Sequence, residues 1–498
     1  MHIEQLIEIC TQFAVKKGLC FEQDKYLVRN KLMTIFNTFN VWEGEVEVPE
    51  SIIPVLEQMT DIANEMGLLE MNTKTFRDMF DTKICACMLM MQSQAEQEFK
   101  KRLTISAKEA TDWFYAFCCD SNYIRTHDIA KNIKYDFASE YADFEVTINL
   151  TKPEKDPVEL ERQRRMPQTN YPKCMLCIEN VGYPGRLGYP SHETLRVIPI
   201  TLGGDTWYFQ YSPYVYYNEH CIVFQKNHSP MTMDRNKFIR LFDFLDQFPH
   251  YFIGSNTQLP IVGGSILAHE HFQGGKHVMP MDNAKEKFSF DCGNTEVSAC
   301  IINWPMSTIR LKSKSRELLT DLGEHIYNVW RNYNDSECNI VSFSDGEEHN
   351  TITPISRLNS LGEYELDVVL RNNLTSDDLP LGIYHPHPDK HHIKRENIGL
   401  IEVMGLFILP GRLKTELDYI AQTWADKKDL EKDNIHFEWF ESFKNNITPS
   451  TKKEALEYIY QQVGFVCENV LRDAGVYKED ACGQEGLKRF LLACGFKL

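Results

Sequence analysis

The sequence lacks any long, uninterrupted apolar segment. Its most apolar stretch, residues 398–410, is broken by Glu402, whereas a membrane-spanning helix needs about 20 consecutive apolar residues. Residues 1–6 also lack the basic segment and the apolar core with which a secretory signal peptide begins. We therefore expect no membrane span and a cytoplasmic location.

Basic residues are in the minority. The chain has 53 Lys and Arg against 71 Asp and Glu, which gives a net charge of −18. A protein that binds duplex nucleic acid needs a basic surface for the phosphates, so we expect no nucleic-acid partner. A small anionic ligand stays compatible with this charge, because a few local cations and backbone N–H groups are enough to hold it.

Cysteine is plentiful, with fifteen residues in the chain. In a protein without an export signal these are better interpreted as reduced thiols than as a disulfide framework. Cys174 and Cys177 differ from the rest because they form a Cys-x-x-Cys pair. That spacing is compatible with a metal site and also with an inert, reduced pair.

The order of elements indicates an α+β protein in which one unit is used twice. At 498 residues the chain is long enough for two or three domains. Two stretches share the same order: strand-like residues, then a helix with one apolar face, then further strands. We predict duplicated units with antiparallel sheets between two helical regions. The four parts are a helical N-terminal region at 1–130, a first half at 131–285, a second half at 286–415, and a helical tail at 416–498.

The two halves differ where the chemistry is expected. The first contains His269-Glu270-His271, and the matching place in the second contains Glu365-Leu366-Asp367. Because the second half has no histidine there, we expect it to support the fold or contact substrate rather than repeat the reaction.

The most informative segment is 263–275, where two histidines and a glutamine are framed by paired glycines. Apolar residues at 259–262 suggest a strand, and alternate side chains of a strand leave the same face. One face of the strand would then carry the side chains of His269, His271 and Gln273, with about 7 Å between each and the next. Glycines let the backbone approach a ligand closely. The pattern is compatible with nucleophilic attack on a phosphate, with half of a metal site, and with a buried polar strand.

Residues 259–275 resemble the Leu-Pro-Ile-Val-Gly-Gly-Ser-Ile-Leu-x-His-x-His-x-Gln-Gly-Gly block of the second, mainly bacterial class of galactose-1-phosphate uridylyltransferases. The likeness extends to four further blocks, at 211–214, 217–220, 348–354 and 391–402. The resemblance implies the histidine-triad fold, used twice in each chain, which agrees with the duplication above.

The resemblance implies a reaction in two half-steps. A histidine attacks the α-phosphorus of UDP-glucose and releases glucose 1-phosphate, and galactose 1-phosphate then takes the uridylyl group to give UDP-galactose. The nucleophile of the family corresponds to His271, and the glutamine that hydrogen-bonds a phosphate oxygen corresponds to Gln273. No organic cofactor is implied. The resemblance is compatible with a homodimer.

Substrate contacts are also implied. In the family the uridylyl group is held by the strand before the motif and by its glycines, which correspond here to Asn256, Gly263, Gly264 and Ser265. Cationic groups ahead of the Cys-x-x-Cys approach the phosphates, and Lys155 and Arg162 lie in that region. A solvated charged loop is the alternative interpretation of these two residues.

Two metal predictions follow from the resemblance to the family's better-known first class. A structural zinc there has a Cys₂His₂ set, whose counterparts are Cys174, Cys177, His228 and His269. The first class also carries iron on a His-x-His of the second half. Glu365 and Asp367 replace that pair, so we expect the iron site to be absent or altered.

Competing interpretations use the same His-x-His. A metal-dependent phosphoesterase would bind a catalytic metal there and activate water. A nucleotidyl hydrolase would pass the nucleotidyl group to water, and an adenylyl-type phosphorylase is a further alternative within the same fold. A catalytically inactive relative would only bind the ligand.

Overall fold

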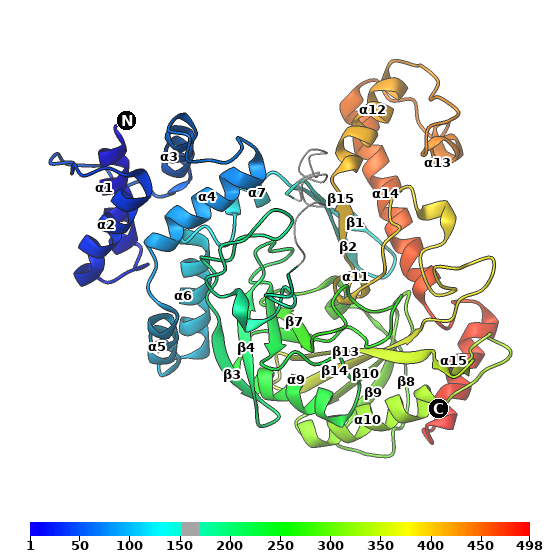
Figure 1. Ribbon diagram of the computed structural model, residues 1–498. Coiled ribbons are helices and arrows are strands. Elements are labelled where there is room, and N and C mark those ends of the chain that lie inside the picture. Colours follow the sequence, from blue (N-terminus) through cyan, green and yellow to red (C-terminus); the bar gives the residue numbers. More distant parts are fainter. Residues whose placement is uncertain (152–168) are drawn as a thin grey trace. The chain divides into compact units, whose positions relative to one another are not determined.

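The computed structural model describes residues 1–151 and 169–498, so Lys155 and Arg162 lie outside the described residues (Figure 1). The chain divides into two compact units. The first unit comprises 1–130 and 153–228, and the second comprises 131–152 and 229–498. The four-part division made from the sequence stays a prediction.

The first unit begins with helices. Ser106 caps α6 by accepting a hydrogen bond from the Glu109 backbone N–H. Phe114 on the buried face of α6 packs against Tyr211 of a strand, with ring centroids 5.4 Å apart. The helices are α1 (Ile3–Lys16), α2 (Lys25–Phe36), α3 (Ile53–Glu65), α4 (Lys74–Cys87), α5 (Gln92–Leu103), α6 (Ala107–Asp120) and α7 (Thr126–Ile129), with 3₁₀ turns η1 (Glu22–Asp24) and η2 (Ile178–Asn180).

Three antiparallel strands follow in the first unit, in the order β3-β4-β5. Their bounds are β3 (Ile198–Leu202), β4 (Asp205–Tyr211) and β5 (Cys221–Gln225). Gly203 and Gly204 join β3 to β4 with φ angles of 60° and 81°, values that favour glycine. Trp207 and Phe209 are fully buried on β4 and form part of the core.

The second unit contains an antiparallel sheet in the order β7-β6-β13-β14-β10-β9-β8. Two helices cover it (Figure 1): α9 packs on β6 and β13, and α10 packs on β10, β13 and β14. Gly323 lets α10 approach α9 closely, because a Cβ there would lie 2.7 Å from the Phe238 ring. The elements are β6 (Phe252–Gly254), β7 (His271–Gly275), β8 (Glu286–Ser289), β9 (Ser298–Ile302), β10 (Thr308–Ser313), β13 (Asn350–Leu358), β14 (Tyr364–Asn372), α9 (Arg235–Gln247), α10 (Arg316–Arg331), and the small hairpin β11 (Phe343–Ser344) and β12 (Glu347–Glu348).

A second, three-stranded sheet and the C-terminal helices complete the second unit. Strand β2 pairs antiparallel with β1 and parallel with β15, and α12 packs along α14 (Figure 1). The remaining elements are β1 (Ile133–Ala138), β2 (Asp143–Asn149), β15 (Leu406–Pro410), α11 (Leu400–Val403), α12 (Arg412–Ala425), α13 (Phe437–Phe443), α14 (Lys452–Ala474), α15 (Ala481–Ala493), η3 (Pro280–Asn283) and η4 (Pro388–Lys390).

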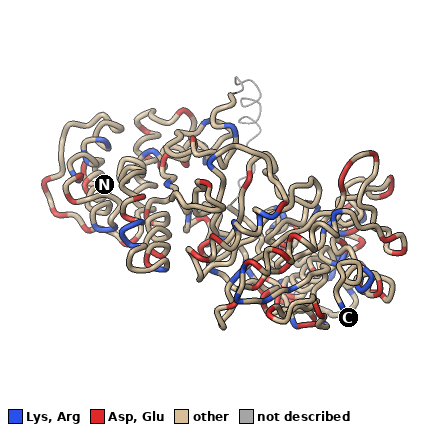
Figure 2. The backbone as a smooth tube through the Cα atoms, turned by 90° about the horizontal axis from the view of Figure 1, so that it is seen from below, with Lys and Arg blue, Asp and Glu red and all other residues tan. Residues whose placement is uncertain are grey.

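Acidic and basic residues are interspersed along the helices of the first unit (Figure 2). Several form ion pairs one helical turn apart, for example Lys74 with Asp78 and Arg102 with Glu98. Within the described ranges, every helix is too short or too polar to span a membrane.

The predicted α+β class is confirmed, with antiparallel sheets, a helical N-terminal region and C-terminal helices. One local prediction was wrong here. Residues 259–262 form a turn rather than a strand, because Pro260 has no N–H for a ladder and Ile261 has a φ of 72°. The parallel pairing of β15 with β2 was not predicted.

Candidate active site

Strand β7 begins at His271, so the strand predicted for the whole His-x-His-x-Gln segment is shorter than expected. Gln273 lies opposite Gly254 of β6, and both glycines that follow Gln273 belong to β7. His269 and Glu270 precede the strand. The backbone N–H of Glu270 donates to the Ser229 carbonyl at 2.7 Å, outside any strand.

The His271 ring is held in one tautomer by the backbone. Its Nδ1 lies 2.8 Å from the carbonyl oxygen of His269. Since a carbonyl oxygen only accepts, Nδ1 carries the proton and Nε2 keeps its lone pair. The sequence alone could not identify this acceptor.

Electrostatics keep the same ring neutral. His271 is 6% exposed. Burial is the largest effect on the pKa of His271 and lowers it to about 4, with a smaller contribution in the same direction from the positive charge of Lys237. The His269 carbonyl acts in the opposite direction. At neutral pH the imidazole is therefore uncharged, which is the form that attacks phosphorus.

Gln273 lies two positions further along β7 and is half-buried. Strand alternation directs its side chain from the same face as His271, and the intervening Phe272 is fully buried. An amide there can donate to an oxygen of a phosphate held at His271.

The loop before β7 brings together three of the four residues expected at the uridylyl group. Asn256 is 4% exposed, and its Oδ1 accepts from the Leu400 backbone N–H at 2.9 Å. A Cβ on Gly264 would lie 2.8 Å from Asn256 Nδ2, and one on Gly263 would lie 2.6 Å from the Leu259 carbonyl. Glycine is thus required for this close approach. Ser265 comes next in the chain and is exposed.

Cys174 and Cys177 form a braced turn in the first unit. Their sulfur atoms are 3.6 Å apart. Asn180 Nδ2 donates to the carbonyl groups of both cysteines, at 2.8 and 2.9 Å. Burial raises the pKa of the Cys174 thiol to about 11, and the nearby Cys177 adds to this.

The four predicted ligands meet. One ligand atom from each of Cys174, Cys177, His228 and His269 lies within 4.8 Å of the others. His228 precedes Ser229, whose carbonyl accepts from the residue after His269, so the chain itself keeps the two histidines close. Two thiols and two imidazoles at this spacing can bind a metal ion. Among the described residues, no other His, Cys, Asp or Glu group has this spacing.

Comparison with known proteins identifies the family. The models of the galactose-1-phosphate uridyl transferase N-terminal and C-terminal domains match residues 21–230 and 244–441. The galactose-1-phosphate uridylyltransferase of Caldanaerobacter subterraneus subsp. tengcongensis is 48% identical over 100% of this chain and 98% of its own length. Those of Fusobacterium nucleatum and Bacillus subtilis are 46% and 40% identical, over 99% and 100% of this chain and 99% and 98% of their own lengths.

The chain belongs to the galactose-1-phosphate uridylyltransferase family. It is therefore an enzyme of a nucleotidyltransferase family, and the relationship expected from the residues is confirmed. Among solved structures, yeast Ap4A phosphorylase Apa2 is 13% identical with a TM-score of 0.33, over 63% of this chain and 92% of that one, a likeness too weak to bear on the argument.

In this uridylyltransferase-family chain, an ion-pair network surrounds Glu365 and Asp367, the residues that the sequence analysis matched to the His-x-His. Arg310 binds Asp367 through two nitrogens, at 2.6 and 2.8 Å, and Arg357 also donates to Asp367 at 2.8 Å. Glu365 joins both arginines. His349, the remaining histidine nearby, contacts Ser344 and Asn373 through its two ring nitrogens.

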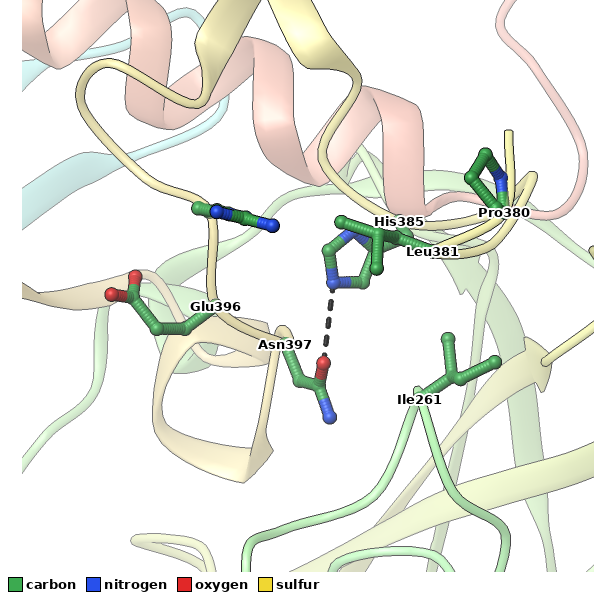
Figure 3. Close-up of a pocket in the computed structure, with 7 residues that line it drawn as sticks. Ile261, Pro380, Leu381, His385, Glu396 and Asn397 are labelled. Atoms are coloured by element: carbon green, nitrogen blue, oxygen red, sulfur yellow. Dashed lines mark hydrogen bonds between the residues drawn. The ribbon is translucent and has the colours of Figure 1, made fainter. Parts of the chain in front are cut away.

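A pocket of about 310 Å³ lies beside the loop that carries the glycines (Figure 3). Ile261 of that loop lines it, together with Pro380, Leu381, His385, Arg395, Glu396 and Asn397. His385 Nε2 lies 3.2 Å from Asn397 Oδ1. The neighbouring His391 contacts the Pro386 carbonyl at 2.8 Å. Each of these two histidines therefore has a hydrogen-bond partner of its own.

Sequence reasoning missed the partner of Glu270. Its carboxylate is paired with Lys237 of α9, and both side chains are buried. A signal was present, because Lys237 occupies the apolar face of its helix, four and eight residues before Leu241 and Leu245. A lysine in that position requires a buried partner.

Proposed function

We propose that this chain transfers the uridylyl group of UDP-glucose to galactose 1-phosphate through a covalent intermediate on His271. The observation that supports this most directly is the contact between His271 Nδ1 and the His269 carbonyl, because it leaves Nε2 unprotonated and the ring neutral. Membership of the uridylyltransferase family supports the choice of substrates.

In the first half-reaction Nε2 forms a bond to the α-phosphorus, and the bond from that phosphorus to the oxygen of glucose 1-phosphate breaks. In the second, an oxygen of the galactose 1-phosphate phosphate group attacks the same phosphorus and the phosphorus–nitrogen bond breaks, which restores His271. Both departing groups leave without a strong protein acid, since one is a sugar phosphate and the other is an imidazole. Gln273 hydrogen-bonds a non-bridging oxygen as negative charge shifts there.

Asn256, Gly263, Gly264 and Ser265 are proposed to contact the uridylyl group. The close packing of the first three supports this, because it leaves backbone groups rather than side chains to face the ligand. Lys155 and Arg162 stay predictions for the phosphates.

The decisive experiment mixes the enzyme with UDP-glucose alone and analyses the protein by mass spectrometry. We expect one uridylyl group on His271 and one equivalent of glucose 1-phosphate released. His271→Asn should form no adduct and lose turnover by many orders of magnitude, whereas His277→Asn, a control at a histidine that contacts Glu145 instead, should form the adduct. A fully active enzyme that never carries the adduct would refute the proposal.

The same mixture distinguishes the competing activities. A metal-dependent phosphoesterase or a nucleotidyl hydrolase would release UMP continuously without galactose 1-phosphate, and the phosphoesterase would stop on chelation. A binding protein would release nothing.

We also propose that Cys174, Cys177, His228 and His269 hold a structural zinc ion. The Cys₂His₂ set and the 4.8 Å spacing of the ligand atoms support this. When bound, zinc would tie the Cys-x-x-Cys turn to the chain before His271. Metal analysis should find about one zinc per chain and far less in Cys177→Ser, with Cys300→Ser as the control at a buried cysteine elsewhere. Full activity with substoichiometric zinc would refute the ligand set.

A further inference from the structure

A buried ion pair lies directly behind the proposed nucleophile. Lys237 Nζ donates to Glu270 Oε1, and the two side chains are 0% and 2% exposed. Glu270 immediately precedes His271, but both oxygens of its carboxylate are already used, one by Lys237 and the other by the Thr232 backbone N–H. The pair is therefore not placed to touch substrate.

The pair contacts the chain on both sides of His271. Glu270 Oε2 accepts from the Thr232 backbone N–H at 2.7 Å. Lys237 Nζ lies 5.0 Å from the centroid of the Phe272 ring, a cation–π distance. Residues 270 and 272 are thus both held by one cation on α9.

One peptide group links this pair to the nucleophile. The His269 carbonyl, which accepts from His271 Nδ1, belongs to the same planar peptide unit as the Glu270 N–H, which donates to Ser229. A rotation of that unit would move the carbonyl away from the ring. Residue 270 lies before β7, so the hydrogen bonds of that strand do not hold its backbone. The side-chain contacts of Glu270 restrict the backbone there instead.

Stability alone does not explain an ion pair in this place. Removing two charges from water is costly, and replacing a buried pair with apolar groups of similar volume is often neutral or stabilising. The pair also restricts orientation, which an apolar contact does not. A carboxylate that accepts from two donors is held in one orientation as well as kept buried.

We propose that Lys237 and Glu270 are positioning residues, which hold the peptide unit between His269 and Glu270 so that its carbonyl fixes the His271 tautomer and the aim of Nε2. This inference rests on the proposed function, because it assumes that His271 is the nucleophile. Neither residue has a chemical step of its own.

The test uses the neutral double variant Lys237→Met/Glu270→Gln. Lys237→Met alone would leave an unpaired buried carboxylate and should unfold easily, whereas the double variant removes both charges and keeps an oxygen for the Thr232 N–H. We expect the double variant to recover most of the urea midpoint that the single variant loses. We also expect its single-turnover uridylylation by UDP-glucose to be about 10–100 times slower than in the unmodified enzyme, the scale of a misplaced reacting group. KM for UDP-glucose should change less than threefold.

A control variant neutralises a second ion pair of the same unit, in which Asp335 is buried and Arg489 is partly exposed. Arg489 binds Asp335 at 2.9 Å far along the chain from the motif. Arg489→Met/Asp335→Asn should shift the urea midpoint and leave the uridylylation rate unchanged.

The outcomes are distinguishable. If the unmodified enzyme forms no adduct on His271, the proposed function fails. If it does form the adduct and the folded double variant reacts within twofold of its rate, the positioning role is refuted and the pair is merely structural. Should the double variant not fold, Glu270→Asp keeps the charge and withdraws the carboxylate by one methylene. The same slowing is expected there, and an unchanged rate would equally refute the inference.

Discussion

Replacing Asp367 with asparagine tests whether the second half of the chain stabilises the fold without taking part in catalysis. Asp367 is fully buried and receives hydrogen bonds from both Arg310 and Arg357. Asparagine has nearly the same shape but no charge, so Asp367→Asn leaves two guanidinium groups with one fewer anion. Glu365 remains as a partner of both arginines.

The magnitude follows from the pKa of Asp367. Burial alone would raise this pKa, but the two guanidinium groups outweigh burial and hold it at about 2, below the usual 3.8 of an aspartate. A carboxyl group whose pKa is lower in the folded state adds stability at pH values above its unfolded pKa and loses that contribution as the pH falls through the folded pKa. This shift corresponds to about 2 kcal/mol of folding free energy at neutral pH. Measured costs of breaking a buried ion pair reach about 3–5 kcal/mol.

Urea unfolding at a series of pH values measures this contribution. At pH 7 we expect Asp367→Asn to lower the free energy of unfolding by about 2–4 kcal/mol. The difference from the unmodified protein should be constant above about pH 5 and should shrink as the pH falls from about 4 towards 2, where the aspartate itself becomes protonated. Turnover per folded molecule should stay within twofold. A difference that does not change between pH 7 and pH 3, or a large loss of turnover in the folded variant, would refute the reasoning.

Three further substitutions probe the site and its support. Gln273→Ala should lower kcat by about 10²–10³, the effect of one lost donor to a charged oxygen, as measured by steady-state kinetics. Gly264→Ala places a Cβ 2.8 Å from Asn256 Nδ2, so KM for UDP-glucose should rise about tenfold. An unchanged KM would show that this loop does not contact the uridylyl group. Gly464→Ala would overlap the Phe137 ring, and the overpacking cost of about 1–3 kcal/mol should exceed the gain of about 1 kcal/mol in helix propensity, so that thermal unfolding occurs at a lower temperature.

The shared face of the His-x-His-x-Gln residues could be predicted from the sequence because these residues are close together in it. His271 and Gln273 are two positions apart, and short spacing on an extended chain predicts a shared face with little help from the rest of the fold. The metal cluster required more, since Cys177 and His269 are far apart in sequence, and there the order of residues in the family provided the expectation. The acceptor for His271 Nδ1 could not be predicted, because it depends on the orientation of one peptide unit.

The strand prediction failed where tertiary contacts outweigh local preference. Ile261 is β-branched, which favours a strand, yet it adopts a φ of 72° next to Pro260 in the turn before the glycines. Glu270 belongs to the same alternating pattern as Phe272, but its N–H bonds to Ser229 rather than to a strand. Neither Ser229 nor Lys237 is near Glu270 in the sequence, so no local pattern could have indicated that the strand starts late.

The contrast between the two halves follows from how each type of side chain can be buried. A neutral imidazole such as His271 needs only one backbone acceptor to be stable in an apolar site, and it keeps a lone pair for chemistry. A buried carboxylate such as Asp367 remains charged only when cations surround it, and the donors of Arg310 and Arg357 then occupy its oxygens. Under the proposed function His271 can therefore supply the nucleophile, whereas Asp367 supplies a cross-link between β10, β13 and β14.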